Sequence, residues 1–130
     1  MKFPYTILYV ENVNATLIFY EKAFGFTKKF CTPENDYGEF VSGETTISFA
    51  SVKLGKSNIK EDFQVSTSSN KPFGMELAFT SENIEADFEK ALSSGTTLVS
   101  AIQEKPWGHK VGYVKDLNGF LIEICAPIGN

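Results

Sequence analysis

The side chains best suited to catalysis are scarce in this chain. It contains one histidine, His109, and two cysteines, Cys31 and Cys125. His109 could act as a general base, but it stands beside a predicted turn at the start of a strand, and a plain strand residue is the better interpretation. Neither cysteine has a local cluster of Lys, Arg or His that would favour a thiolate, so we interpret both as small apolar core residues.

Composition narrows the class of protein. The chain has 130 residues, of which 42% are hydrophobic, and this is enough for one globular domain with a packed core. The twelve Phe residues fit such a core or, more specifically, an aromatic-lined pocket. The net charge of −4 and the lack of any Lys or Arg run argue against nucleic acid and anionic membranes as partners.

Targeting signals are absent from the sequence pattern. No apolar run approaches the ~20 residues that span a bilayer. The start, Met1-Lys2-Phe3-Pro4, leads directly into a predicted strand and lacks the apolar stretch of a signal peptide. Unpaired cysteines fit a reducing compartment. We therefore expect a cytoplasmic protein.

Hydrophobic periodicity, turn residues and helix caps divide the chain into two similar halves. Asn12 and Asn83 are each a good N-cap for a following helix. In the first half, the pattern predicts strands over 3–10, 26–31, 37–42 and 45–51, and a helix over 15–24. In the second half, it predicts strands over 74–79, 97–103, 110–115 and 120–126, and a helix over 84–92.

The two halves form an internal repeat. Residues 5–13 and 76–84 both read as a strand-like run, then Glu-Asn-Val or Glu-Asn-Ile, then a helix. We predict an α+β fold of two βαβββ modules with two sheets and two helices. The boundaries are a single domain over 1–130, with module 1 at 3–51, a polar linker at 52–73 that contains a short helical turn at 60–63, and module 2 at 74–126.

Two sets of motifs carry a family resemblance. The first is Val10-Glu11-Asn12-Val13 followed by Phe19-Tyr20-Glu21-Lys22-Ala23-Phe24-Gly25-Phe26. The second is Pro106-Trp107-Gly108, then Asp116-Leu117-Asn118-Gly119 and Leu121-Ile122-Glu123-Ile124. They resemble the opening and closing signatures of the vicinal oxygen chelate superfamily, which includes glyoxalase I, extradiol dioxygenases, fosfomycin resistance proteins and the bleomycin resistance protein.

The resemblance implies a particular architecture. Each βαβββ module of that superfamily curls its mixed sheet into an open cup, and the modules together enclose a cup-shaped cavity for the ligand, often across a dimer. Sheet edges and apolar rims of such cups are usually covered by a second subunit. We therefore expect a homodimer with a small-molecule ligand as its other partner.

The resemblance also implies where a metal would be held. In the enzymes, His, Glu or Gln side chains on the first and last strand of each module bind a divalent metal. The matching positions here are Tyr5, Ser48, Glu76 and Glu123. A stable site needs three or four imidazole or carboxylate donors, whereas these positions supply two carboxylates. We therefore expect no metal and no other cofactor.

Glu76 and Glu123 allow two interpretations. One is a residual metal site completed by Tyr5 or His109. The other is a pair of carboxylates that face a pocket, where like charges raise at least one pKa and where a cationic or hydroxylated ligand could bind. Glu123 could equally be a solvent-facing or ion-paired strand residue.

Aromatic residues complete the candidate site. In members that resemble the bleomycin resistance protein, a Trp in the context of Trp107 lies near the ligand groove, although a Trp that closes one end of the sheet is an equal alternative. Flat, conjugated ligands could stack on aromatic side chains of the predicted strands. The stacking candidates are Tyr5, Phe40, Phe49 and Tyr113.

These observations lead to one preferred function and two alternatives. The preferred function is a metal-independent binding protein of the glyoxalase/bleomycin resistance type, which takes an aromatic or amphipathic compound, including cationic ones such as antibiotics, in a groove between modules. The first alternative is a metal-dependent, glyoxalase-like lyase or a dioxygenase that uses Glu76 and Glu123 to hold the metal, which would polarise substrate oxygens. The second is a regulatory or immunity subunit with a protein partner.

Overall fold

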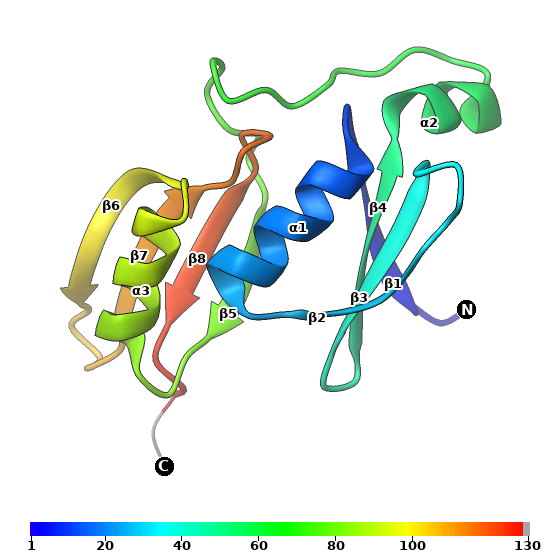
Figure 1. Cartoon of the computed structure of the whole chain (residues 1–130). Helices are drawn as coiled ribbons and strands as arrows, with labels where there is room; N and C mark the ends of the chain where they lie inside the picture. The colour runs from blue at the N-terminus through cyan, green and yellow to red at the C-terminus, as the bar shows by residue number, and fades with distance from the viewer. Residues whose placement is uncertain (129–130) are drawn as a thin grey trace. The chain divides into compact units, whose positions relative to one another are not determined.

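The predicted repeat is present in the structure as two βαβββ sets of elements. The computed structural model describes residues 1–128, and the chain divides into two compact units, Met1–Val65 (unit 1) and the residues from Ser66 onward (unit 2). Unit 1 contains β1 (Tyr5–Val10), α1 (Val13–Phe24), β2 (Thr27–Cys31), β3 (Tyr37–Ser42), β4 (Thr45–Ser51) and α2 (Val52–Ile59) (Figure 1). Unit 2 contains β5 (Glu76–Thr80), α3 (Ile84–Ser93), β6 (Thr97–Glu104), β7 (Lys110–Lys115) and β8 (Leu121–Cys125).

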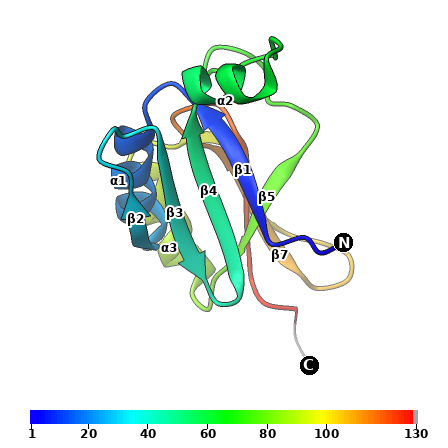
Figure 2. The ribbon, with the colours of Figure 1, turned by 90° about the vertical axis from the view of Figure 1, so that its right-hand side faces the viewer.

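The two sheets have the same topology. Within residues 1–128, each unit has one four-stranded mixed sheet, in the order β1-β4-β3-β2 in unit 1 and β5-β8-β7-β6 in unit 2. The first strand of each unit runs parallel to the last, as β1 and β4 show in Figure 2, and the remaining pairs are antiparallel. The α+β fold class is therefore confirmed.

Helix α1 builds the core of unit 1. The Asn12 side chain accepts a hydrogen bond of 2.9 Å from the Ala15 amide at its start, and Gly25, with a φ of 73°, ends it in the left-handed conformation. Both caps were predicted. Tyr20 of α1 is fully buried against the rings of Phe40 and Phe49, at centroid distances of 6.2 and 4.8 Å.

Helix α3 plays the same part in unit 2. Asn83 caps it through a longer contact of 3.5 Å with the Ala86 amide. Ser81 supports this turn, since its hydroxyl accepts from the Asn83 amide at 3.0 Å and donates to Asp87 at 2.6 Å. The buried face of α3, which includes Phe88, lies on β7 and β8.

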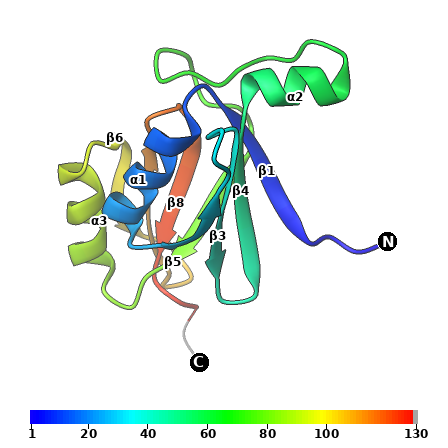
Figure 3. The same ribbon diagram turned by 45° about the vertical axis from the view of Figure 1, so that its right-hand side comes forward.

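The second helix of unit 1 was not predicted. The sequence indicated two helices in the chain, whereas residues 1–128 contain three, because residues 52–59 of the expected linker form α2 (Figure 3). The predicted helical turn at 60–63 is not among them. Gly, Ser and Asn lower the helix propensity of this segment. Tertiary contacts stabilise it instead, since Gly55 lies directly against the Tyr9 ring, which also stacks on Phe63 at 4.9 Å.

The end of the expected linker, residues 66–73, belongs to unit 2 and packs there. Ser66 Oγ donates a hydrogen bond of 2.8 Å to the Asn118 carbonyl, and Lys115 Nζ donates one of 3.2 Å to the Ser68 carbonyl. Gly119, at a φ of 85°, approaches Thr67 so closely that a side chain there would displace the segment. Among residues 1–128, no helix combines the length and the apolar character needed to span a membrane.

Candidate functional site

Each sheet has one face that a helix covers, α1 in unit 1 and α3 in unit 2. We call the opposite face of each sheet its open face. Side chains alternate along β1, where Leu8 is 4% exposed on the α1 side while Tyr5 and Ile7 are 43% and 41% exposed on the open face. In unit 1, α2 and Phe63 lie against Tyr9 at one end of this face.

A polar cluster occupies the middle of the open face of unit 1. The register pairs Ile7 of β1 and Glu39 of β3 with Ser48 of β4, so the three side chains share a row. The Tyr37 hydroxyl donates to Glu39 Oε2 at 2.6 Å and is hydrogen-bonded to Ser48 Oγ at 3.0 Å. Lys29 Nζ lies 3.8 Å from Glu39 Oε1. Burial, and then the hydrogen bond to Glu39, raise the pKa of Tyr37, so it stays a donor at neutral pH.

The open face of unit 2 carries a related cluster. The register pairs Glu123 of β8 with Ala78 of β5 and with Tyr113 of β7. The Tyr113 hydroxyl donates to Glu123 Oε1 at 2.8 Å. This hydrogen bond, followed by burial, raises the pKa of Tyr113 to about 12. The phenol is therefore a protonated donor, and not a general base, at neutral pH.

Glu76 joins this cluster from the first strand of unit 2. Burial, then the charge of Glu123 and a hydrogen bond between the two side chains, raise the pKa of Glu76. Cys125 lies on the same face, and burial followed by Glu123 raises its thiol pKa to about 11, so this thiol is not a nucleophile at neutral pH.

The structure places two of the aromatic candidates away from the open face. Phe40 and Phe49 are both 0% exposed, and they pack against Tyr20 beneath α1. Strand alternation explains the correction, because Phe40 lies one residue after Glu39 and therefore faces the core. Neither ring can stack on a ligand without opening that core. Tyr5 and Tyr113 are on open faces as the pattern requires.

The remaining candidates have simpler surroundings. Trp107 is 72% exposed in the turn between β6 and β7. His109 Nε2 lies 2.6 Å from the Ala126 carbonyl oxygen, which can only accept, so the ring donates a structural hydrogen bond. Cys125 is buried as predicted, whereas Cys31, at the end of edge strand β2, is only partly buried.

The side chains at the metal positions do not fit a divalent metal. Tyr5 and Ser48 come from unit 1, Ser48 is hydrogen-bonded to Tyr37, and neither is a strong ligand. Glu76 and Glu123 of unit 2 supply the two carboxyl groups, and Glu123 Oε1 already accepts from the Tyr113 hydroxyl at 2.8 Å. In the described part of the chain, no group of three or more His, Cys, Asp and Glu side chains is arranged to hold a metal ion.

Glu39 was missed by sequence reasoning, as were its neighbours Tyr37 and Lys29. Its position could have been found, because the predicted hairpin over 37–42 and 45–51 already fixes the register through the Gly43-Glu44 turn. That register pairs Glu39 with Ser48, a candidate residue, as the structure shows.

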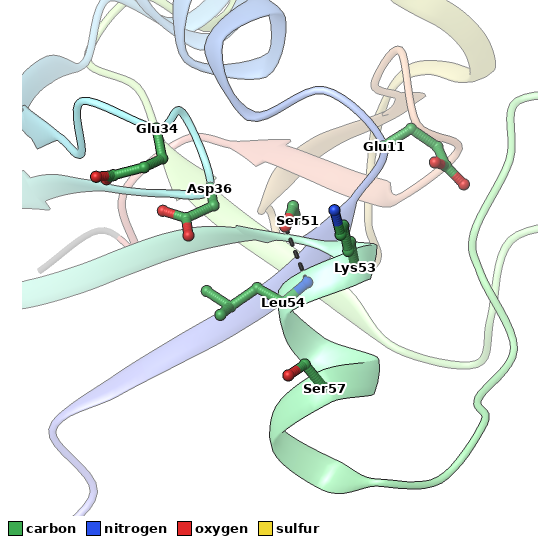
Figure 4. A pocket seen from close by; sticks show the side chains of 7 residues that line it. All are labelled: Glu11, Glu34, Asp36, Ser51, Lys53, Leu54 and Ser57. Atoms are coloured by element: carbon green, nitrogen blue, oxygen red, sulfur yellow. Dashed lines mark hydrogen bonds between the residues drawn. The ribbon is translucent and has the colours of Figure 1, made fainter.

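Unit 1 also contains a solvent-open cavity of about 480 Å³ where β4 ends and α2 begins. Figure 4 shows its lining and the hydrogen bond of 3.0 Å from the Leu54 amide to Ser51 Oγ that caps α2. The lining residues are Glu11, Glu34, Asp36, Ser51, Lys53, Leu54 and Ser57. None of them was a candidate, and Lys53, Leu54 and Ser57 fell in the expected linker.

Two βαβββ units, each with a four-stranded mixed sheet and a helix on one face, form a glyoxalase-type fold. The chain belongs to the glyoxalase-like domain family, whose sequence model matches residues 3–129. This confirms the resemblance to the vicinal oxygen chelate superfamily. An uncharacterized protein of Mycobacterium bovis is 25% identical over 125 residues, which cover 93% of this chain and 80% of that protein.

Solved structures show the same fold. A glyoxalase-related enzyme from Fulvimarina pelagi superimposes with a TM-score of 0.82 at 20% identity, over 99% of this chain and 93% of that one. A glyoxalase/bleomycin resistance protein/dioxygenase family enzyme from Burkholderia phytofirmans gives a TM-score of 0.76 at 16% identity, over 96% and 98% of the two chains. At these identities the likeness shows the fold alone, because the fold carries many activities.

Proposed function

We propose that this protein binds an aromatic or amphipathic small molecule through its open sheet faces and needs no metal to do so. It would then be a binding protein of the glyoxalase/bleomycin resistance type, not a lyase or dioxygenase. Sequestration requires a complementary surface and no reacting group. This agrees with clusters in which the phenols stay protonated at neutral pH.

One observation carries the proposal: Glu123, one of the two carboxyl groups at the family's metal positions, already accepts a hydrogen bond from another side chain. Glu123 Oε1 accepts from the Tyr113 hydroxyl at 2.8 Å, and burial together with the neighbouring Glu123 raises the pKa of Glu76. A metal at Glu123 would compete with the Tyr113 hydrogen bond and would still lack a third strong ligand. A ligand with hydroxyl or amine donors can instead use the remaining lone pairs of the same oxygens.

Ligand binding with and without metal tests the proposal. We would screen metal-free protein by thermal shift against flat aromatic compounds, cationic and neutral, with metal-free bleomycin among them. Hits would then be titrated by calorimetry in EDTA and again with added Zn²⁺ or Mn²⁺. We expect a ligand that raises the melting temperature in EDTA, because a molecule that binds only the folded state stabilises it.

Variants connect the binding to unit 2. We expect Glu123→Gln to weaken a hit that donates to this carboxylate by about tenfold, the typical effect of losing a charge-assisted hydrogen bond. Glu82→Gln is the matched control, since Glu82 is exposed before α3 and its replacement removes the same charge. Binding that appears only after metal is added, or turnover of a glyoxalase or catechol substrate with metal, would show that the proposal is wrong.

A further inference from the structure

Glu39 offers one carboxylate oxygen to a ligand. Its side chain is 13% exposed, and Oε2 is held by the Tyr37 hydroxyl at 2.6 Å. Oε1 faces the ammonium of Lys29, whose Nζ lies 3.8 Å away, and this distance is too long for a hydrogen bond. One oxygen therefore fixes the orientation of the carboxylate while the other keeps its acceptor capacity.

Lys29 shows what kind of group suits this oxygen. Its ammonium approaches Oε1 from β2, where the pairing with β3 shifts register between Lys28 and Phe30. Such a bulge re-aims side chains on an edge strand. The Lys29 side chain is 57% exposed, so its ammonium is held loosely and a second cation can replace it.

Two exposed hydrophobic side chains lie beside the polar cluster that contains Glu39. Phe30 is paired with Glu39 across the strands and is 41% exposed, and its ring centre lies 5.9 Å from that of Tyr37. Val41, two residues further along β3 on the same face, is also 41% exposed. A partly buried carboxylate among exposed hydrophobic side chains is complementary to a cation attached to an aromatic or hydrocarbon body.

We infer that Glu39 is the specificity-determining residue of unit 1 and that it selects ligands bearing a primary ammonium group beside an aromatic ring. The ammonium donates to Glu39 Oε1 in place of Lys29, and the ring lies on Phe30. Tyr37 is a positioning residue, because it holds the carboxylate through Oε2 without contacting the ligand. This inference rests on the proposed function and names its ligand class.

The site borders one of the family's metal positions, because Glu39 is paired with Ser48, but it does not use the carboxylates at those positions. Glu39 lies on β3, whereas those positions fall on the first and last strands of each module. The ligand preference therefore depends on unit 1, and the carboxyl pair Glu76 and Glu123 of unit 2 does not set it.

A matched pair of probes tests the inference. 1-Naphthylmethylamine is a cation at neutral pH, and 1-naphthalenemethanol presents the same ring with a neutral hydroxyl group. Calorimetry in low salt with EDTA would give both dissociation constants. We expect the wild type to prefer the amine about tenfold, as a charge-assisted hydrogen bond implies. We expect Glu39→Gln to bind the two probes equally and to bind the alcohol as the wild type does.

Three further variants separate specificity from stability. Glu44→Gln removes an exposed charge from the β3–β4 turn and should leave the preference unchanged. Lys29→Met removes the competing ammonium and should tighten the amine about threefold. Tyr37→Phe should reduce the amine preference without weakening the alcohol, an effect that general destabilisation would not produce. In Glu39→Gln the new amide oxygen can still accept from Tyr37, which protects the fold.

Amide chemical shifts of the wild-type protein give a readout that needs no variant. Amine titration should perturb the amides of β2 and β3 more than those of β8. Equal affinity of the wild type for both probes, or a preference that Glu123→Gln abolishes and Glu39→Gln keeps, would overturn the inference and leave the proposed function in place. Failure of both probes and of the whole screen would overturn the proposed function as well.

Discussion

Gly38 on β3 of unit 1 and Gly112 on β7 of unit 2 occupy equivalent positions in their sheets. The register pairs Gly38 with Phe49 and Gly112 with Ile124. In each unit the helix fills the space where a side chain would stand, since a Cβ would lie 2.5 Å from Leu17 at Gly38 and 2.6 Å from Phe88 at Gly112. In both units, the glycine therefore leaves room for a side chain of the helix that covers the sheet.

The next position along each strand differs. Glu39 faces Ser48 across the sheet in unit 1, whereas Tyr113 faces Glu123 at the equivalent pair in unit 2. The carboxylate has moved from the third strand to the last. In both units a tyrosine hydroxyl donates to it, Tyr37 at 2.6 Å and Tyr113 at 2.8 Å.

The difference separates the requirements of the fold from those of the ligand. A buried position tolerates little change, because interiors are close-packed and even one extra methyl group lowers the stability of the fold. A position on an open face can change its chemistry and leave the fold intact, so the open faces are where function can diverge.

The shared packing is tested by filling both glycine positions. We expect Gly38→Val and Gly112→Val each to lower the free energy of unfolding by about 2–3 kcal/mol, because the added groups overlap buried side chains of α1 or α3. Gly74→Val is the control, since a Cβ there meets no atom within 4 Å. Urea unfolding followed by circular dichroism measures the three values. A large loss in one unit alone would show that the helices are not packed equivalently.

The pKa values of Tyr37 and Tyr113 give a test of how the two open faces differ. The folded protein holds the Tyr113 proton more tightly than the unfolded chain does, because the pKa rises from 10.0 to about 12. This contribution to stability is complete below pH 10 and is lost as the pH rises toward 12. Ultraviolet absorbance of tyrosinate should show a late transition that Tyr113→Phe removes.

Glu123→Gln should lower the pKa of Tyr113 toward its ordinary value, since the negative charge that holds the proton is gone. Tyr37→Phe is the matched variant of unit 1 and should leave the late transition in place. If Tyr37→Phe removes that transition instead, the stronger tyrosine–carboxylate pair belongs to unit 1 and the comparison is reversed.

Helix α2 is the main addition that unit 1 has over the shared pattern. We expect Phe63→Ala to weaken its attachment by about 1 kcal/mol, the typical worth of an aromatic pair, since Phe63 stacks on Tyr9. Amide hydrogen exchange of residues 52–59 should then quicken about fivefold. Phe30→Ala alters a partly exposed ring on the open face and should leave this exchange unchanged. Equal exchange in wild type and Phe63→Ala would mean that Gly55 and Tyr9 hold the helix without Phe63.

Local signals were sufficient to predict most of this fold. Asn12 marks the start of α1 and Gly25 marks its end, and both signals can be recognised in a single sequence. The Gly43-Glu44 turn likewise predicts a hairpin. Helix α2 has a weaker local signal, the N-cap Ser51 at its start. Its sequence Val-Lys-Leu-Gly-Lys-Ser-Asn-Ile is a poor helix former, and the contact of Gly55 with Tyr9 links residues far apart in the chain.

The sequence was sufficient to predict what kind of site this is, but not all of the residues that form it. The repeat located Glu76 and Glu123, and strand alternation placed Tyr5 on the open face. Phe40 was misassigned because residue type was weighed without the face that alternation gives it. Glu39 was overlooked because β3 carries none of the family's metal positions, and the candidates on the third strands were chosen as aromatic residues.

The helix caps give the finest test of how alike the units are. Asn12 accepts from the Ala15 amide at 2.9 Å, whereas Asn83 lies 3.5 Å from the Ala86 amide. We expect Asn12→Ala to lower the free energy of unfolding by about 1 kcal/mol and Asn83→Ala by about 0.5 kcal/mol. Ser81→Ala should cost more than Asn83→Ala, because Ser81 bonds both the Asn83 amide and Asp87. Equal losses for the two Asn variants would mean that Asn83 caps α3 as strongly as Asn12 caps α1. The Ser81 hydrogen bonds would then not compensate for a weaker cap.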